Sequence, residues 1–161
     1  MGKKNTRFEE YGLEAAIKNR RTIREISGKS VGSSDLERLA WAAYGCTLIE
    51  DGDKYRTAPS AGATYPVEIH AIVERVKGYD DGIYFYDTKT EGLKLRKAGV
   101  FLQEIRKISW DQEFVELSNA AFILVYNPGK IEKEYGAKSR DYALLECGHI
   151  AQKFFRAGRK C

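Results

Sequence analysis

Arg-Thr-Ala-Pro-Ser-Ala-Gly-Ala-Thr-Tyr-Pro, residues 56–66, is the stretch of sequence from which the fold prediction starts. Small residues fill most of it, and two prolines bracket its glycine. Pro59 and Pro66 fix their own φ angles and favour extended geometry at the residue before each, including Tyr65, so the sequence predicts a stiff loop. Gly62 and the neighbouring alanines offer almost no steric barrier, so this backbone can lie close to another object.

The loop has two interpretations. Ser60 and Thr64 carry hydroxyls that can donate and accept hydrogen bonds, and a bare backbone with such groups is typical of a loop that contacts a ligand. The alternative is an ordinary connection between a helix and the apolar run that begins at Val67. The loop by itself leaves both interpretations open.

Composition describes a globular protein of one domain. The chain has 161 residues, of which 43% are hydrophobic and 31% charged, and a formal net charge of +4 that suits anionic small molecules as well as nucleic acid. No run approaches the roughly 18 apolar residues of a membrane span, and no apolar stretch follows the charged N-terminus, so we expect a cytoplasmic protein. The cysteines and histidines form no metal-ligand cluster, so we expect no metal site.

Three arginines lie close together after a predicted N-terminal helix at residues 8–19. The segment reads Arg20-Arg21-Thr22-Ile23-Arg24, and guanidinium groups match phosphate oxygens in a bidentate way. Ile23 is predicted to tether the segment to the core and so to aim the arginines. The alternative is a solvated basic surface, which is the usual fate of a run of charges.

The rest of the chain alternates helical and strand patterns, which favours the α+β class. Ser34 and Glu37 form a capping box that predicts a helix start, and Gly45 is expected to end that helix. Residues 120–126 are the most apolar run and are predicted to form a central strand. The other predicted elements are strands at 67–76, 82–87 and 93–95, helical pieces within 99–119 and a last helix from about 139 to 157. Residues at helical spacing on that last helix are Leu144, Cys147, Gly148, Ala151 and Phe155.

Three landmarks together resemble the nitroreductase family of FMN-dependent oxidoreductases, in particular its branch of SagB-type dehydrogenases. They are Asn19 to Arg24, then Arg56 to Ala63 followed by Gly82 to Asp87, and finally Leu145 to Gln152. Their order and spacing match over roughly residues 12–153. The resemblance implies an α+β fold: a nitroreductase-like α/β sandwich whose central, mainly antiparallel sheet is flanked by helices and which forms dimers.

The resemblance also implies a flavin site. By position, the family residues that hold the FMN phosphate and ribityl chain correspond to Arg20, Arg21, Thr22 and Arg24. The loop that approaches the isoalloxazine ring, often from the second subunit of a homodimer, corresponds to Pro59, Ser60, Ala61 and Gly62. The implied cofactors are FMN, with NAD(P)H as electron donor, and the implied partners are a second copy of the chain and a small-molecule electron acceptor, with no nucleic acid and no membrane.

We expect residues 1–161 to form a single nitroreductase-like FMN-binding domain that departs from the family at its C-terminus. Family members continue after the helix that carries His149 into a Gly-rich segment, a strand, a flavin-contacting loop and a basic tail. Here the sequence runs from Lys153 to Cys161 and stops. We therefore expect the C-terminal part of the family fold to be missing after about residue 153.

The leading functional hypothesis is an FMN-dependent oxidoreductase in which NAD(P)H reduces the flavin and the flavin reduces a quinone, nitroaromatic or heterocyclic acceptor. A flavin carries such chemistry itself, which suits a sequence in which no catalytic residue is identified. Cys46 and Cys147 lie in apolar contexts, and His149 is expected on a buried helix face, so all three are interpreted as structural residues. The alternative is a flavin- or ligand-binding protein without efficient turnover. A basic nucleic-acid-binding module is disfavoured because no predicted helix carries a basic stripe.

Overall fold

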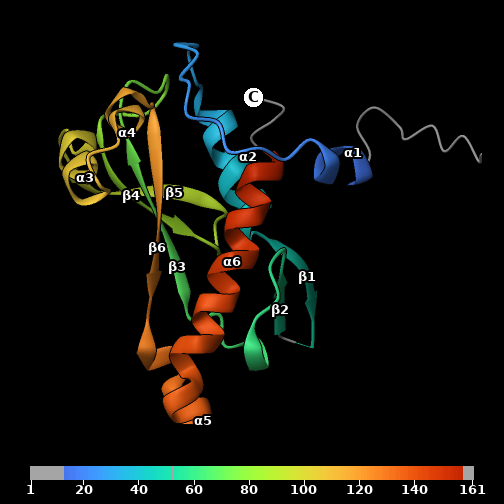
Figure 1. Cartoon of the computed structure of the whole chain (residues 1–161). Coiled ribbons are helices and arrows are strands. Elements are labelled where there is room, and N and C mark those ends of the chain that lie inside the picture. Colours follow the sequence, from blue (N-terminus) through green and yellow to red (C-terminus); the bar gives the residue numbers. More distant parts are fainter. Residues whose placement is uncertain (1–12, 52, 158–161) are drawn as a thin grey trace, which may run out of the picture.

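An antiparallel sheet with two long helices against one face forms the body of the molecule (Figure 1). The computed structural model describes residues 13–51 and 53–157. Its helices and strands, in chain order, are α1 (Leu13–Lys18), α2 (Ser33–Tyr44), β1 (Cys46–Glu50), β2 (Asp53–Arg56), β3 (Val67–Val73), β4 (Gly82–Asp87), β5 (Gly92–Ala98), α3 (Leu102–Ile108), α4 (Glu113–Leu117), β6 (Ala120–Tyr126), α5 (Glu132–Tyr135) and α6 (Ser139–Ala157). The main sheet has the order β5-β4-β3-β6, and β1 and β2 pair separately as a hairpin. This arrangement of helices on an antiparallel sheet confirms the predicted α+β class.

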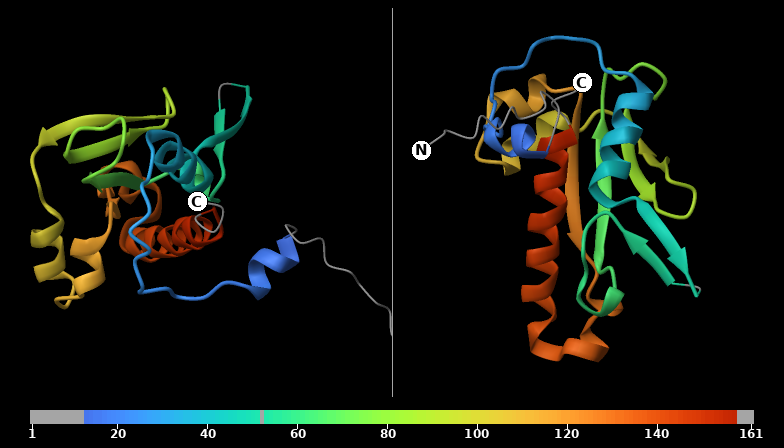
Figure 2. Two further views of the ribbon diagram at one scale, coloured as in Figure 1. Left: turned by 90° about the horizontal axis from the view of Figure 1, so that it is seen from above. Right: turned by 90° about the vertical axis from the view of Figure 1, so that its right-hand side faces the viewer.

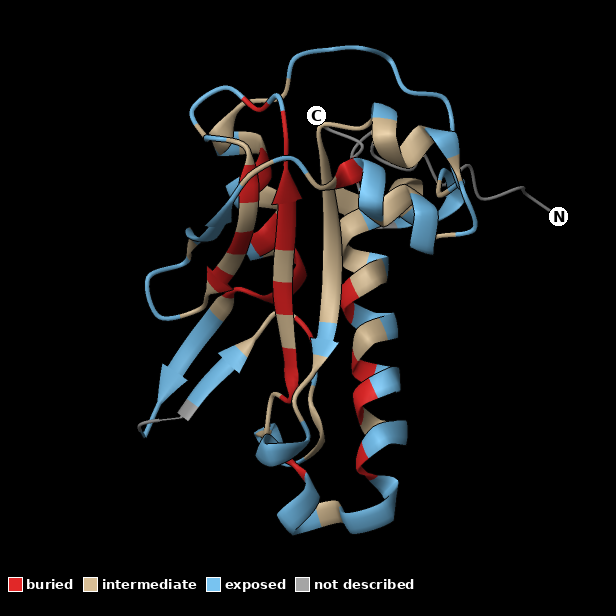
Figure 3. Cartoon of the chain, turned by 90° about the vertical axis from the view of Figure 1, so that its left-hand side faces the viewer, coloured by how far each residue is buried: buried red, intermediate tan, exposed pale blue. Residues whose placement is uncertain are grey.

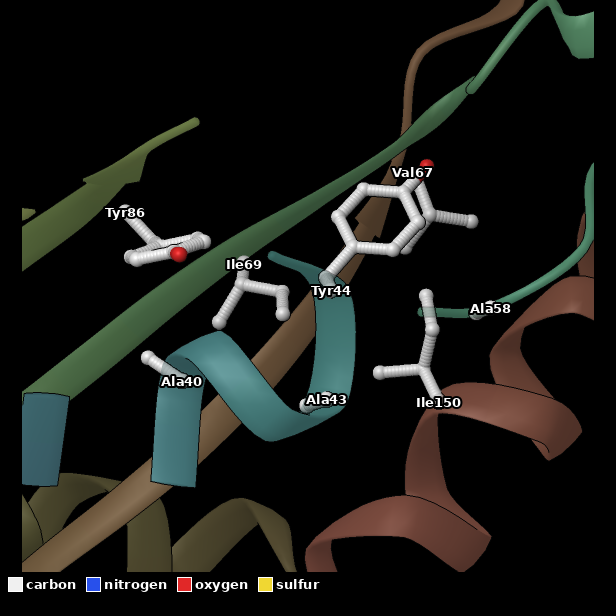
Figure 4. Close-up of a cluster of buried hydrophobic side chains, with 8 residues drawn as sticks. All are labelled: Ala40, Ala43, Tyr44, Ala58, Val67, Ile69, Tyr86 and Ile150. Carbon is white, nitrogen blue, oxygen red and sulfur yellow. The ribbon is translucent and has the colours of Figure 1, made fainter. Parts of the chain in front are cut away.

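β3 lies inside the sheet because it pairs with β4 on one side and with β6 on the other. Its side chains alternate, so Val67, Ile69 and Ala71 are buried while Glu68 and His70 lie half-buried on the opposite face. Full burial of an aliphatic side chain stabilises the fold by about 1.5–3 kcal/mol. Figure 4 shows the core cluster that α2, β3, β4, α6 and the loop after β2 share: Ala40, Ala43, Tyr44, Ala58, Val67, Ile69, Tyr86 and Ile150.

The prediction that residues 120–126 form a central strand is wrong, because β6 lies at the edge of the sheet and pairs with β3. Its apolar character comes from packing on its faces. The ring of Phe122 stacks on that of Phe154 in α6, with centroids 4.4 Å apart, and Leu124 packs against the core cluster. An apolar run does not by itself distinguish burial by pairing from burial by face packing.

α6 begins and ends as the helical spacing predicts, at Ser139 and Ala157. Its core-facing stripe consists of Ala143, Glu146 and Ile150, all of which are buried. Although α6 is long, no helix in residues 13–51 and 53–157 is long and apolar enough to cross a membrane. The buried residues of α6 pack on the sheet from one side of the helix.

The opposite face of α6 carries most of the residues that the sequence pattern singles out (Figure 3). Leu144 and Phe155 are exposed there, although both are apolar. Gly148 is also exposed, and a Cβ added to it would meet no atom within 4 Å. This stripe of exposed apolar and small residues leaves room for another helix.

The start of α2 differs from the predicted capping box. Gly32 is the N-cap, and its N–H donates to Oδ2 of Asp35 at 3.4 Å, so Ser34 lies inside the helix. The carboxylate of Glu37 instead accepts a hydrogen bond from the hydroxyl of Tyr79 at 2.6 Å. Glu37 therefore makes a tertiary contact with Tyr79 and does not cap α2.

The predicted hairpin at 82–95 is confirmed as β4 and β5, and the predicted helical pieces within 99–119 are α3 and α4. The carboxylate of Glu74, which is buried just after β3, accepts backbone N–H bonds from Phe101 and Leu102 at 2.7 and 2.6 Å. These are amide groups that the start of α3 would otherwise leave without partners. Glu74 thereby fixes where α3 begins.

Candidate active site

The small-residue loop connects β2 to β3, so it follows a strand and not a helix. The sequence analysis did not identify the preceding hairpin, in which Cys46–Glu50 pairs with Asp53–Arg56. The dipeptide Asp51-Gly52 was the available signal, because Asp-Gly is a preferred hairpin turn. The hairpin brings Arg56 to the start of the loop.

The loop backbone is bent more sharply than its prolines predict. Gly62, Ala63 and Tyr65 have φ angles of 55°, 52° and 48°, in the left-handed region. The prediction that Pro66 holds Tyr65 extended is therefore wrong. A left-handed conformation costs a residue with a Cβ about 1 kcal/mol or more, so other contacts must hold this shape.

Three hydrogen bonds hold the loop in its bent form. Oγ of Ser60 accepts from the backbone N–H of Tyr65 at 2.9 Å, and the hydroxyl of Thr64 donates to the carbonyl of Ala61 at 2.9 Å. The backbone N–H of Arg56 donates to the hydroxyl of Tyr65 at 3.2 Å. The end of the loop is thus tied to its start.

The guanidinium of Arg56 lies between two tyrosine rings. Its central carbon is 4.4 Å from the ring centroid of Tyr44 and 4.4 Å from that of Tyr65. The two rings are arranged edge to face, with centroids 6.0 Å apart. Each cation–π contact contributes about 0.5–2 kcal/mol. Together they join β2, α2 and the loop.

A buried carboxylate, Glu146 of α6, lies beneath the loop. Glu146 is 2% exposed and accepts a hydrogen bond from the hydroxyl of Tyr44. Burial raises the pKa of Glu146, while hydrogen-bond donation by the Ser60 and Tyr44 hydroxyls, the charge of Arg56 and the backbone N–H of Val67 act in the opposite direction. Burial and the contact with Glu146 raise the pKa of Tyr44, so its hydroxyl stays protonated and can donate.

Arg56 and Glu146 belong to the predicted landmarks, but the cluster that they form with Tyr44 and Tyr65 was not predicted. Glu146 had one signal: it stands at helical spacing from Ala143 and Ile150, where an apolar residue is expected. Tyr44 and Tyr65 had none, because they are 21 positions apart and meet only in the folded chain. Only the folded structure therefore shows this cluster.

The four residues predicted to face a flavin differ in exposure. Pro59 and Gly62 are exposed, whereas Ser60 and Ala61 are half-buried. A Cβ placed on Gly62 would lie 2.6 Å from the hydroxyl of Tyr135, so α5 already lies against one side of the loop. A substitution at Gly62 would disturb the packing of the chain itself as well as any ligand.

The predicted phosphate-binding segment between α1 and α2 lies at the opposite end of the molecule from the loop (Figure 1). Residues 21–30 are all exposed, and Ile23 is 65% exposed, so the prediction that Ile23 tethers the segment to the core of its own chain is wrong. The guanidinium of Arg21 donates to the carbonyls of Lys18 and Arg20 at 3.1 and 2.7 Å. The structure does not bring the predicted phosphate-binding segment and the loop together within one chain. The segment between α1 and α2, to which Arg20, Arg21, Thr22 and Arg24 belong, lies at one end, and the segment between β2 and β3, to which Pro59 to Gly62 belong, lies at the other.

α1 stands apart from the sheet, as the view from above shows (Figure 2). The predicted N-terminal helix at residues 8–19 corresponds to α1 in its second half, and residues 8–12 lie outside the described part of the chain. α1 and the exposed segment that follows it therefore lie away from the sheet.

The remaining candidate side chains do not form a second site. His149 is exposed, so the prediction that it lies on a buried helix face is wrong. Cys46 and Cys147 are half-buried, and burial raises the pKa of the Cys147 thiol, which suits packing better than nucleophilic chemistry. Among the described residues, no group of three or more His, Cys, Asp and Glu side chains is placed to hold a metal ion.

The molecule is an α+β sandwich with a bent loop of small residues at one end, and comparison of its sequence with known proteins identifies its family. The chain matches the sequence model of the Nitroreductase family over residues 17–159. It is 31% identical over 148 residues to MJ1384 of Methanocaldococcus jannaschii, which is named as a nitroreductase, and the match covers 92% of this chain and 73% of MJ1384. The chain belongs to the nitroreductase family.

Solved structures share the fold. A Ralstonia eutropha JMP134 protein assigned as a nitroreductase has a TM-score of 0.75 and 21% identity, with 91% of this chain and 64% of the other covered. One from Anabaena variabilis ATCC 29413 has a TM-score of 0.69 and 23% identity, with 75% and 26% covered. A chain of the E. coli microcin synthetase McbBCD complex with truncated pro-MccB17 bound has a TM-score of 0.68 and 19% identity, with 99% and 64% covered. The chain thus spans less than two thirds of each solved structure.

Proposed function

We propose that the protein is an FMN-dependent oxidoreductase in which NAD(P)H is the electron donor and a quinone, nitroaromatic or heterocyclic compound is the acceptor. The observation that carries the proposal is the loop: an exposed backbone of small residues, bent into a left-handed shape and held from below by a buried polar cluster. A flat ring needs a surface without bulky side chains that is well supported, and this loop is rich in small residues and held by three hydrogen bonds. Membership of the nitroreductase family supports the same assignment.

The residues fit the two ends of FMN. Arg20, Arg21 and Arg24 have guanidinium groups suited to a phosphate, and Thr22 adds a hydroxyl for the ribityl chain. The backbone of Pro59 to Gly62 can approach the isoalloxazine because it carries no bulky side chain. When bound, the flavin supplies the electron transfer itself, and the protein supplies binding and orientation.

We also propose that the protein is a homodimer in which the loop of one chain meets the arginine segment of the other. The two groups lie at opposite ends of one chain, so a single copy cannot bring both to one FMN. The exposed face of α6 is a suitable contact, because Leu144 and Leu145 are 57% and 63% exposed and Gly148 has open space beside it. Light scattering that shows a stable monomer at micromolar concentration would contradict this arrangement.

Exchange of Arg20 or Arg24 for Ala tests the flavin assignment. A charge-assisted hydrogen bond is worth roughly 1.5–3 kcal/mol, so each change should weaken FMN binding about ten- to a hundredfold. Riboflavin lacks the phosphate, so its affinity should change little. Flavin fluorescence titration measures both affinities, and Arg140→Ala is the matched control because Arg140 is an exposed arginine on α6.

Equal weakening of FMN and riboflavin would show that the arginines do not bind the phosphate. Absence of any flavin binding by the unaltered protein would refute the proposed function itself. Oxidation of NAD(P)H by the flavin-loaded protein separates the enzyme from a flavin-binding protein without efficient turnover. Comparison of NADH with NADPH in the same assay identifies the donor.

A further inference from the structure

The hairpin of β1 and β2 exposes apolar side chains on both of its faces. It forms a two-stranded sheet apart from the main one. Leu48 and Tyr55 lie opposite each other in its register and are 52% and 42% exposed, and Ile49, on the other face, is 63% exposed. An isolated two-stranded hairpin is only marginally stable in water and needs a further element to pack against it. The hairpin is therefore suited to contact another segment.

Residues 14–30, which we call the N-terminal arm, form a second exposed apolar region. The arm comprises most of α1 and the connection to α2, and it lies away from the sheet (Figure 2). Its three isoleucines, Ile17, Ile23 and Ile26, are 57%, 65% and 41% exposed. Isoleucine is among the residue types that are most often buried. Three exposed isoleucines so close together in the sequence mark a surface that a partner can cover.

The hairpin and the arm carry opposite charges. The turn of the hairpin reads Glu50-Asp51-Gly52-Asp53, and Glu50 and Asp51 are exposed and form no ion pair within residues 13–51 and 53–157. The arm has two acidic residues and five basic ones, so its net charge is +3. The basic residues are Lys18, Arg20, Arg21, Arg24 and Lys29. Opposite charges favour the encounter of two surfaces and fix their register.

Within one chain the arm lies apart from its own hairpin. The arm precedes Ser33 and the hairpin follows Tyr44, so the two are joined to opposite ends of α2. α2 has 12 residues and is therefore about 18 Å long, and Figures 1 and 2 show α1 and the hairpin apart from each other. In a two-fold dimer, a contact between the arm of one copy and the hairpin of the other occurs twice. A second copy of the chain can therefore cover both surfaces at once.

We propose that the N-terminal arm of one copy packs on the β1–β2 hairpin of a second copy, with the arm isoleucines against Leu48 and Tyr55 and the arm basic residues beside the acidic turn. This inference rests on the proposed homodimer and names one of its contacts. The hairpin ends at Arg56, where the loop begins. The contact therefore brings the arginine segment of one copy towards the loop of the other, as the proposed FMN site requires.

Charge reversal on each surface tests the contact. In the hairpin variant, Glu50→Lys and Asp53→Lys make the turn basic, while the Asp51-Gly52 pair that favours a tight turn is kept. In the arm variant, Lys18→Glu and Lys29→Glu make the arm acidic. Each variant sets like charges against each other at both contacts of its homodimer, so its dissociation constant should rise about tenfold or more. Sedimentation equilibrium without flavin measures this constant.

An equimolar mixture of the two variants gives the decisive comparison. In the mixed dimer, the basic hairpin of one copy meets the acidic arm of the other, and at the second contact both surfaces are unaltered. The mixture should therefore form dimers about as tightly as the unaltered protein, although neither variant does so alone. Restored association also shows that both variants are folded. A mixture that associates no better than the separate variants would overturn the proposal.

Glu104→Lys with Glu113→Lys is the matched control, because both glutamates are exposed, on α3 and α4, and the change in net charge equals that of the hairpin variant. It should leave the dissociation constant unchanged. Leu48→Ser should raise the constant about tenfold, because it removes apolar area from the contact. Ile108→Ser, at an 80% exposed position on α3, should not. Equal effects in the control and the hairpin variant would also overturn the proposal.

The same measurements separate a failure of this contact from a failure of the proposed function. A monomeric unaltered protein would refute the homodimer and this contact with it, and the flavin titration would still decide whether the protein binds FMN. An unaltered dimer that neither charge reversal weakens would overturn the contact alone. The hairpin would then be covered by another part of the second copy or by a different protein.

Discussion

Two buried glutamates, Glu74 and Glu146, serve different purposes in the same fold, although each is 2% exposed. Glu74 accepts hydrogen bonds from two backbone N–H groups, those of Phe101 and Leu102, which are neighbours in the chain. Glu146 is bonded to the hydroxyl of Tyr44, which is 102 positions away. One carboxylate begins a helix, and the other connects separate parts of the molecule.

The type of donor explains what each carboxylate can control. Backbone amides at a helix start have fixed directions, so Glu74 determines one local structure and its loss removes that structure. Side-chain hydroxyls rotate, so the neighbours of Glu146 can reorient when it changes. We therefore expect changes at Glu74 to affect the start of α3, and changes at Glu146 to affect the packing of α2 against α6.

Glu74→Ala should have the largest effect. It removes two charge-assisted hydrogen bonds from backbone amides, each worth roughly 1.5–3 kcal/mol, and the partly exposed ion pair with Arg75, so the free energy of unfolding should fall by about 3 kcal/mol or more. Urea unfolding followed by circular dichroism measures this loss. Glu132→Ala is the control, because Glu132 is exposed on α5 and its change should stay within about 0.5 kcal/mol. Equal losses in the two variants would show that Glu74 does not hold α3.

The sequence predicted the local elements because their signals are local. The hairpin of β4 and β5 follows from alternating residues around a turn that contains Gly92, and α6 from apolar residues at helical spacing up to Phe155. It did not predict which side of α6 is buried. Two stripes on this helix are apolar, one with Ile150 and one with Leu144, and periodicity alone does not tell the core from an exposed surface.

The sequence predicted the loop residues of the site but not the side chains that pack around the loop. Arg56 to Pro66 are contiguous, so their composition was visible in the sequence. The left-handed φ of Tyr65 was not visible in the sequence, because it depends on Ser60 and on the arginine and tyrosine side chains that pack around it. Glu146 is 102 positions from Tyr44, and one sequence carries no information on that contact.

Tyr44→Phe and Tyr86→Phe form a matched pair with a smaller expected effect. Both tyrosines are 1% exposed and belong to one core cluster, but the hydroxyl of Tyr86 has no hydrogen-bond partner among the described residues. Removal of the Tyr44 hydroxyl takes a donor from Glu146 and should cost about 1.5–3 kcal/mol. Removal of the Tyr86 hydroxyl should be neutral within about 0.5 kcal/mol or stabilising, because a buried polar group without a partner is unfavourable. Thermal unfolding of the two variants compares them directly, and equal destabilisation would mean that the contact between Tyr44 and Glu146 contributes nothing.

The pH dependence of stability should show the smallest effect. Burial raises the pKa of Glu146 above its unfolded value near 4.5, so between the two pKa values the folded state binds more protons than the unfolded state. Stability contributed by this group is therefore complete below about pH 4.5 and falls as the pH rises through the folded pKa, by at most about 1.4 kcal/mol per pH unit.

Glu146→Gln cannot titrate, so its stability relative to the unaltered protein should improve as the pH rises from 4.5, even though it is the less stable protein overall. Melting temperatures of both proteins between pH 4.5 and 8 measure this difference. Asp87→Asn, followed between pH 2 and 4.5, gives the opposite sign, because hydrogen bonding to Lys94 lowers the pKa of Asp87 to about 2, so its contribution is present above about pH 3.8 and is lost as the pH falls towards 2. Parallel profiles for Glu146→Gln and the unaltered protein would mean that the hydrogen bond from Tyr44 and the charge of Arg56 fully offset the burial of Glu146, and that its carboxylate is ionised throughout this pH range.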